Sequence, residues 1–171
     1  MPLLYLIRHG KPEITGVMLG QMDPPLSEEG RRQAAALATL QIEVAWTSPL
    51  RRARETAACM ASSRITELTE LKEMDLGDWT GKTWDAIENA WPDLAARKIA
   101  DWLGWAAPAG EDWHEFLNRV RNAWNRIKAG PFPAAVVAHE GVNAALMHLI
   151  QGSDPLQFRQ GYGEVIRVEY D

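Results

Sequence analysis

The sequence predicts an α/β fold in which helices cover a largely parallel β-sheet. Short apolar runs of strand length alternate along the chain with segments of helical periodicity. Strands that are separated by helices need crossover connections, which make neighbouring strands parallel. The runs at residues 3–8 and 134–138 are apolar without alternation, as expected of strands that are covered on both faces.

The first half of the chain contains three strand candidates and two helix candidates. The strand at 3–8 is followed by a polar loop, rich in glycine and proline, that reaches residue 26. Ser27, which two glutamates follow, is a favourable N-cap for the first helix. The candidates that follow are a strand at 44–47, a helix at 50–62 and a strand at 65–68.

The second half contains the remaining helices and strands. A helical pattern from 84 to 103 is interrupted by Pro92 and ends before Gly104, and residues 112–127 form a clear amphipathic helix. The later elements are a strand at 134–138, a helix at 140–150 and an alternating run at 165–170 that is typical of a sheet edge.

Composition limits the classes of function. The 171 residues are enough for one domain with a hydrophobic core, and a formal net charge of −5 without a basic block argues against nucleic acid as a partner. No apolar run approaches the ~20 residues that span a bilayer, and the first apolar run is too short for a signal peptide, so we expect a cytoplasmic protein. Cys59 is the single cysteine, which excludes an internal disulfide, and its helix-like context predicts a buried side chain.

Cationic and imidazole side chains follow three of the predicted strands. Arg8 and His9 end the first strand, Arg51 and Arg52 follow the second, and His139 follows the later buried strand. Parallel sheets gather such residues beyond the carboxyl ends of their strands. Guanidinium groups bind phosphate oxygens in pairs, so a phosphoryl group is the expected occupant, and a neutral imidazole there can attack phosphorus to form a phosphohistidine. Each group alone has an ordinary alternative, as a core or capping histidine or a solvated helix face, but their joint placement favours a site.

Several segments resemble those of the histidine phosphatase superfamily, whose fold is phosphoglycerate mutase-like. They are LIRHGKPE near the start, TSPLRRARETA at 47–57, LKEMDLGDWTG at 71–81, PAGEDW at 108–113 and VVAHEGV at 136–142. They follow the family's order through most of the chain. The resemblance implies a three-layer sandwich with a largely parallel central sheet, in a single domain over residues 1–171 with a small helical cap inserted at about 81–112.

The same resemblance implies roles for five residues. His9 takes the phosphoryl group, and Arg8 and Arg52 hold its oxygens; the register of the second segment selects the latter of two adjacent arginines. His139 donates to the phosphoryl group in its protonated form, and Glu73 is first the general acid and then the base that activates water. A raised pKa would suit Glu73 to both steps. The resemblance implies neither a metal nor another cofactor, because cationic side chains neutralise the developing charge.

Three positions depart from the family pattern. Thr15 stands where many relatives have an asparagine that touches the phosphate, and its hydroxyl can serve the same purpose. Glu140 follows His139 where glycine is common, so its carboxylate is expected to point away from the phosphate or to contact a donor on the substrate. Thr80 replaces a glutamate of the family, which should alter the support of Glu73 more than the chemistry.

The substrate is less defined than the reaction. Seven of the eight tryptophans lie between Trp79 and Trp124, and they form either the core of the cap or, at Trp79 or Trp84, a stacking surface for the substrate. The loop at 16–30 resembles that of α-ribazole phosphatases, although Leu19 replaces their tyrosine, so α-ribazole 5′-phosphate is one candidate. The expected partner is a small phosphate ester. A phosphoglycerate mutase-type phosphotransferase, a protein phosphohistidine phosphatase and a phosphate-binding module are the alternatives, and either a monomer or a homodimer fits the sequence.

Overall fold

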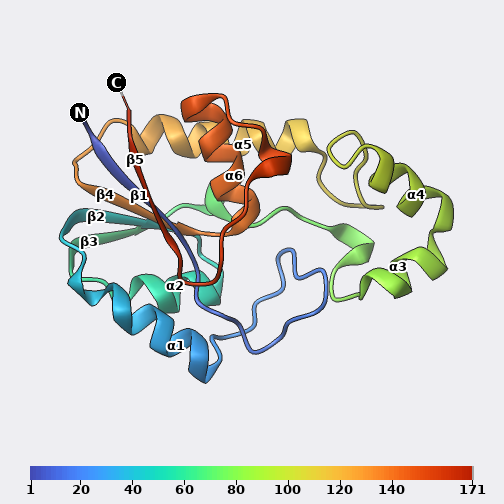
Figure 1. Ribbon diagram of the computed structural model, residues 1–171, viewed down its shortest axis with the longest axis horizontal. Helices are drawn as coiled ribbons and strands as arrows, with labels where there is room; N and C mark the ends of the chain where they lie inside the picture. Colours follow the sequence, from blue (N-terminus) through green and yellow to red (C-terminus); the bar gives the residue numbers. More distant parts are fainter. Residues whose placement is uncertain (171) are drawn as a thin grey trace.

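A computed structural model describes residues 1–170 and confirms the predicted α/β fold (Figure 1). The sheet has five strands in the order β3-β2-β4-β1-β5. The first four in that order are mutually parallel, whereas β5 pairs antiparallel with β1 and forms the edge, as predicted. The strands are β1 Leu3–Arg8, β2 Ile42–Thr47, β3 Ser62–Glu67, β4 Ala134–Ala138 and β5 Val165–Glu169.

Helices cover both faces of this sheet, which gives the three layers. Helices α1 (Glu28–Ala35) and α2 (Arg51–Ala57) lie on one face, and α5 (Trp113–Ile127) and α6 (Glu140–Gln151) lie on the other (Figure 1). Helices α3 and α4 lie beyond the sheet, at the far end of the molecule, and form the cap. The remaining elements are α3 Trp84–Ala90, α4 Pro92–Ala100 and the 3₁₀ turns Ala36–Thr39, Thr69–Leu71, Gly77–Trp79 and Pro155–Gln157.

The hydrophobic core is divided by the sheet into two clusters. Leu6, Val136 and Phe116 belong to the cluster between the sheet and the α5 and α6 layer. Ile7 and Ala53 belong to the cluster on the opposite face. Every residue of β4 is buried, which agrees with its uninterrupted apolar sequence. The central strands that end at the site are therefore held on both faces.

Capping residues define where several helices begin. The Ser27 side chain accepts a hydrogen bond from the backbone N–H of Gly30 at the start of α1, as its sequence context predicted. Asp112 and Glu115 form a reciprocal capping box at the start of α5. This capping box fixes the first turn of α5, which begins directly after the inserted segment with α3 and α4.

Three expectations for the segment between β2 and β3 are wrong. The helix predicted over 50–62 ends at Ala57, and β3 begins at Ser62, earlier than predicted. Cys59 is exposed in the turn after α2, where its Sγ contacts only the Glu55 carbonyl, at 3.6 Å. The error arises because β3 is an exposed edge strand, so its sequence lacks the apolar alternation that would have marked its start.

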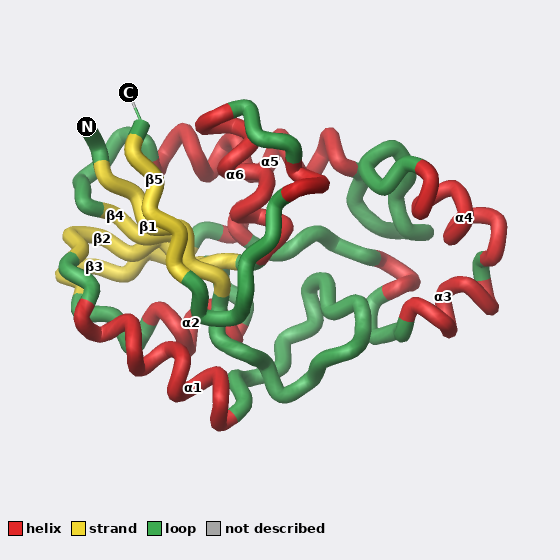
Figure 2. Tube along the Cα trace, viewed as in Figure 1, coloured by secondary structure: helices red, strands yellow, loops and turns green. Residues whose placement is uncertain are grey.

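The cap has a small core of its own. Trp79, Ile87, Ala95 and Ala107 form a buried cluster that is separate from the two clusters of the sheet. Figure 2 shows that the long loop between β1 and α1 extends toward this cap. Among the described helices, none has the length and apolar character needed to cross a membrane.

Candidate active site

Three neighbouring strands bring the predicted site residues to one edge of the sheet. Strands β2, β4 and β1 are adjacent, with Arg8 paired to Ala138 and Thr47 paired to Val137. The residues that follow these strands, His9, Ser48 and His139, therefore leave the sheet at the same level. The convergence predicted from the sequence is thus produced by strand order and register.

His9 lies directly after β1 and is only 4% exposed. Its Nδ1 lies 2.7 Å from the Gly10 carbonyl oxygen, which can only accept, so Nδ1 carries the proton and Nε2 carries the lone pair. Burial, together with the neighbouring Arg52 and Arg8, lowers the pKa of His9 from 6.5 to about 3. The imidazole is therefore neutral at pH 7.

Arg52 is almost fully buried against this imidazole. Its Nε donates a long hydrogen bond of 3.3 Å to His9 Nε2, and its terminal nitrogens donate to the carbonyls of Met22, at 2.6 Å, and Gly20, at 2.9 Å. The adjacent Arg51 is exposed and pairs with Glu55 instead. The structure thus brings Arg52, and not Arg51, to the site, as predicted.

Arg8 lies on the other side of His9. Its Nη1 donates to the Gln160 carbonyl at 2.6 Å, and its guanidinium carbon lies 4.1 Å from the centre of the Tyr162 ring. The Nε atom is buried and has no hydrogen-bond partner within residues 1–170. A bound anion could accept from this N–H, which otherwise carries the cost of an unsatisfied donor.

His139 is buried behind His9, with the two ring centres 5.1 Å apart. Its Nε2 makes a 2.8 Å hydrogen bond with the Ser48 hydroxyl, whereas the buried Nδ1 lacks a partner among the described residues. Burial and the charges of His9 and Arg52 lower its pKa well below 6.5. Without an anion, His139 is therefore neutral, whereas the protonated form was expected with the anion bound.

Glu73 lies in the loop that follows β3 and reaches the start of α6. Its carboxylate accepts from the backbone N–H groups of Met74, at 3.0 Å, and Gly141, at 3.3 Å. A Cβ at Gly141 would lie 2.5 Å from Glu73 Oε1, so only glycine permits this approach. Loss of hydration raises the pKa of Glu73, although the two N–H groups and the charges of Arg52 and Arg119 oppose the rise.

These side chains form one end of a cavity of about 670 Å³ that extends beneath the cap. Arg8, His9, Arg52 and Glu73 line the polar end. The walls further out are largely apolar and carry the aromatic residues Trp102, Trp105, Trp113, Phe116 and Phe158, whereas Tyr162 lies beside Arg8 and His9. The cavity is large enough for a phosphate ester with a sizeable leaving group.

Three further predicted residues lie in different places relative to this cavity. Thr15 is exposed on the loop between β1 and α1 and does not line the cavity. Trp79 is fully buried in the cap cluster, so the interpretation as cap core is correct for this residue. Glu140 lines the cavity, and its carboxylate accepts from Gln160 N–H at 3.0 Å and lies 3.4 Å from Arg8 Nη1.

Sequence reasoning missed several residues that shape the site. Tyr162 stacks near both Arg8 and His9, but a tyrosine in a loop carries no recognisable pattern. Ser48 lies within the segment at 47–57 that resembles the family, so the resemblance could have drawn attention to its hydroxyl. Arg119, on α5, binds the backbone of the loop that carries Glu73, and only the tertiary structure discloses this contact. Within residues 1–170, no three histidine, cysteine, aspartate or glutamate side chains cluster as ligands of a metal ion would.

Curated relatives of the chain include phosphatases with different substrates in their names. The adenosylcobalamin/alpha-ribazole phosphatase of Salmonella typhimurium is 31% identical over 155 residues, covering 84% of this chain and 77% of that protein. The glucosyl-3-phosphoglycerate phosphatase of Mycolicibacterium vanbaalenii is 33% identical over 168 residues, covering 87% and 74%. A bifunctional protein of Mycobacterium tuberculosis is 31% identical, but the chain spans only 47% of its length.

Two solved structures of similar fold carry names like those of these relatives. A mycobacterial glucosyl-3-phosphoglycerate phosphatase in complex with inorganic phosphate superposes with a TM-score of 0.84 at 28% identity, covering 99% of this chain and 90% of that chain. An E. coli structure described as "a putative alpha-ribazole-5'-P phosphatase" gives a TM-score of 0.86 at 27% identity, covering 97% of this chain and 89% of that chain. The family model described as "Histidine phosphatase superfamily (branch 1)" matches residues 4–171. The chain belongs to the histidine phosphatase superfamily and is a phosphoric monoester hydrolase.

Proposed function

We propose that the protein is a metal-independent phosphomonoesterase that transfers the phosphoryl group of a small phosphorylated metabolite to His9 and then to water. The state of the His9 imidazole carries this proposal. Gly10 holds the proton on Nδ1, and the low pKa keeps the ring neutral, so the Nε2 lone pair is available beside Arg52. A neutral, oriented imidazole between two guanidinium groups suits attack on a phosphate ester.

The first step forms a phosphohistidine. His9 Nε2 attacks phosphorus, the bond between phosphorus and the ester oxygen breaks, and Glu73 gives its proton to the leaving oxygen. The raised pKa of Glu73 favours the protonated form that this step needs. Arg8 Nε and a protonated His139 Nδ1, both buried and free of protein partners among the described residues, would then donate to the phosphoryl oxygens together with Arg52.

The second step returns the enzyme to its starting state. Glu73, now a carboxylate, takes a proton from water as the water oxygen attacks phosphorus. The phosphorus–nitrogen bond breaks, inorganic phosphate leaves, and His9 is again neutral. The guanidinium groups of Arg8 and Arg52 supply the charge that a metal ion supplies in other phosphatases, so the mechanism needs none.

The cap and the cavity bear on the substrate. We regard the chain as one domain in which the insertion at about 81–112 encloses the leaving group. The aromatic and aliphatic wall favours a leaving group with an aromatic or apolar body. A small polar group would leave this apolar surface in contact with water instead of burying it. The benzimidazole of α-ribazole 5′-phosphate meets that requirement, and the names of two relatives support this candidate.

Kinetics of a single variant test the reaction. His9→Ala should reduce hydrolysis of p-nitrophenyl phosphate by roughly 1,000-fold or more, because no nucleophile remains. Radiolabelled substrate should leave an acid-labile phosphoryl group on the wild type and none on the variant. His114→Ala is the matched control, since this exposed histidine lies on α5. Unchanged turnover in His9→Ala would refute the mechanism.

A substrate screen separates the remaining alternatives. α-Ribazole phosphate, phosphoserine, sugar phosphates and a phosphohistidine peptide are ranked by kcat/KM, and the aromatic ester is expected to rank first. Incubation with 3-phosphoglycerate and a bisphosphate primer tests the phosphotransferase alternative. Isomerisation without release of inorganic phosphate would replace hydrolysis as the main activity.

A further inference from the structure

Arg119, in the middle of α5, uses its whole guanidinium group in hydrogen bonds. Nε and Nη2 donate to the two carboxylate oxygens of Glu111, each at 2.8 Å. Nη1 donates at 2.8 Å to the carbonyls of both Glu70 and Lys72, and Nη2 donates at 3.2 Å to the carbonyl of Glu73. Since an arginine has five N–H donors, none remains for a ligand.

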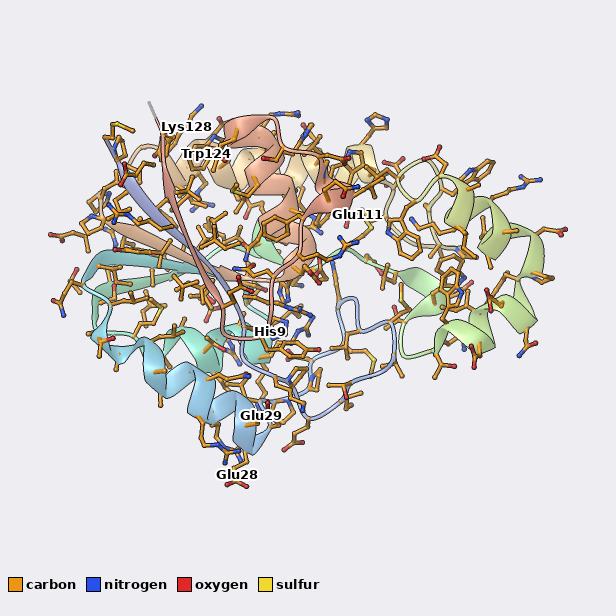
Figure 3. All side chains as sticks on the ribbon, viewed as in Figure 1. His9, Glu28, Glu29, Glu111, Trp124 and Lys128 are labelled. Atoms are coloured by element: carbon orange, nitrogen blue, oxygen red, sulfur yellow. The ribbon has the colours of Figure 1, made fainter. Side chains whose placement is uncertain are left out.

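These bonds join two segments that are far apart in the sequence. The three carbonyls belong to the loop after β3 that carries Glu73. Glu111, which is labelled in Figure 3, lies at the end of the segment that leads from the cap back to α5. Backbone bonds reinforce the junction, because Glu111 N–H donates to the Asp75 carbonyl at 2.9 Å and Asp75 N–H donates to Glu111 Oε2 at 3.2 Å. The pair is well shielded, with the Arg119 and Glu111 side chains 21% and 14% exposed.

The Glu73 carboxylate is held in position by backbone N–H groups alone among the described residues. Its hydrogen-bond partners are the N–H groups of the next residue, Met74, and of Gly141. No side chain among the described residues donates to it. A shift of the backbone at 70–73 would therefore move the carboxyl group away from α6 and from the ester oxygen.

We propose that Arg119, held by Glu111, is a positioning residue for the Glu73 carboxyl group. It joins the carbonyls of Glu70, Lys72 and Glu73, the last of which also accepts from Gln21 Nε2 at 3.1 Å, and so fixes the loop from which the acid projects. The proposal rests on the acid and base role of Glu73 proposed above. The positive charges of Arg119 and Arg52 also act on the Glu73 carboxyl group, and both oppose the rise in its pKa.

The dependence of the rate on the leaving group tests this role. Phenyl phosphate and p-nitrophenyl phosphate are similar in size, but phenolate is the more basic leaving group and needs protonation far more. Arg119→Met should lower kcat/KM for phenyl phosphate by about 10- to 100-fold, within the range of general acid catalysis, and for p-nitrophenyl phosphate by less than about 3-fold. Arg126→Met is the control, because the exposed Arg126 lies on the same helix and forms an ion pair with the Glu70 side chain, at 3.6 Å.

A double-mutant cycle shows whether Arg119 acts through Glu73. Glu73→Gln should produce the same selective loss for phenyl phosphate, and Arg119→Met in that background should add little, because the group being positioned is already absent. If Glu73→Gln lacks the selectivity, the proposed role of Glu73 fails. If Glu73→Gln has it and Arg119→Met slows both esters equally, only the positioning proposal fails.

A loss of stability in Arg119→Met would not prevent the test. Circular dichroism and Tm are measured for every variant, and Arg119→Lys and Glu111→Gln replace Arg119→Met if it does not fold. Both retain part of the junction, so a smaller loss with the same preference for phenyl phosphate is expected. Equal losses for the two esters in both variants would overturn the proposal.

Discussion

The buried, neutral state of His9 has a measurable effect on stability. With a pKa of about 3 in the folded protein and 6.5 as its ordinary value, the imidazole binds a proton more readily in the unfolded chain. The contribution to stability is therefore fully present above pH 6.5 and is lost as the pH falls toward 3. Lowering the pH to about 4.5, which is two units below 6.5, therefore removes about 3 kcal/mol.

Urea unfolding of wild type and His9→Gln measures this contribution. Tryptophan fluorescence follows the transition at about pH 7 and about pH 4.5, and the wild type should lose about 3 kcal/mol more than the variant. His139 also titrates in both proteins and its pKa is lowered in part by His9, so the double variant His9→Gln/His139→Gln is compared with His139→Gln to separate the contribution of His9. Equal losses in wild type and His9→Gln would show that His9 is not held neutral by the fold.

Three other substitutions test separate parts of the site. Gly141→Ala should lower kcat/KM for phenyl phosphate by about 10-fold or more, since its Cβ would lie 2.5 Å from Glu73 Oε1; normal rates in steady-state assays would contradict that crowding. Glu140→Gln should strengthen inhibition by inorganic phosphate by roughly 3- to 10-fold, since a carboxylate 3.4 Å from Arg8 no longer competes with the anion, and weaker inhibition would reverse the argument. Arg52→Lys should lower kcat/KM for both aryl esters by roughly 100-fold, because an ammonium cannot reproduce the fork that Arg52 directs at Met22 and Gly20, and rates near wild type would show that charge alone suffices.

The location of the site was predictable because it follows from strand order. Arg8 ends β1, and His9 and His139 come directly after β1 and β4, whose apolar sequences are unmistakable; parallel strands place such residues at one edge. Arg52 needed one further step, because two adjacent arginines follow β2 and only the family register distinguished them. Local sequence and topology were sufficient for Arg8, His9 and His139, whereas Arg52 also required the resemblance to the family.

Contacts that depend on packing between distant segments were not predictable. Tyr162 reaches Arg8 from a loop near the end of the chain, and Arg119 reaches the Glu73 loop from a helix whose periodicity marks only its buried stripe. Trp79 shows a related difficulty, because a tryptophan in the cap has the same sequence signal whether it packs inside the cap or against a ligand. Composition identifies such side chains, but only the fold decides what they face.

The junction at Arg119 also bears on how the cap can vary. Glu111 and Asp75 are hydrogen-bonded to each other on either side of the cap, and Arg119 donates to Glu111 and to three carbonyls of the loop that carries Glu73. The polypeptide between these ends starts and finishes at one fixed place, so its length and sequence can change while the acid stays in position. We therefore expect that grafting the cap of another family member between 75 and 111 changes leaving-group selectivity while the phosphoryl chemistry of this scaffold is kept.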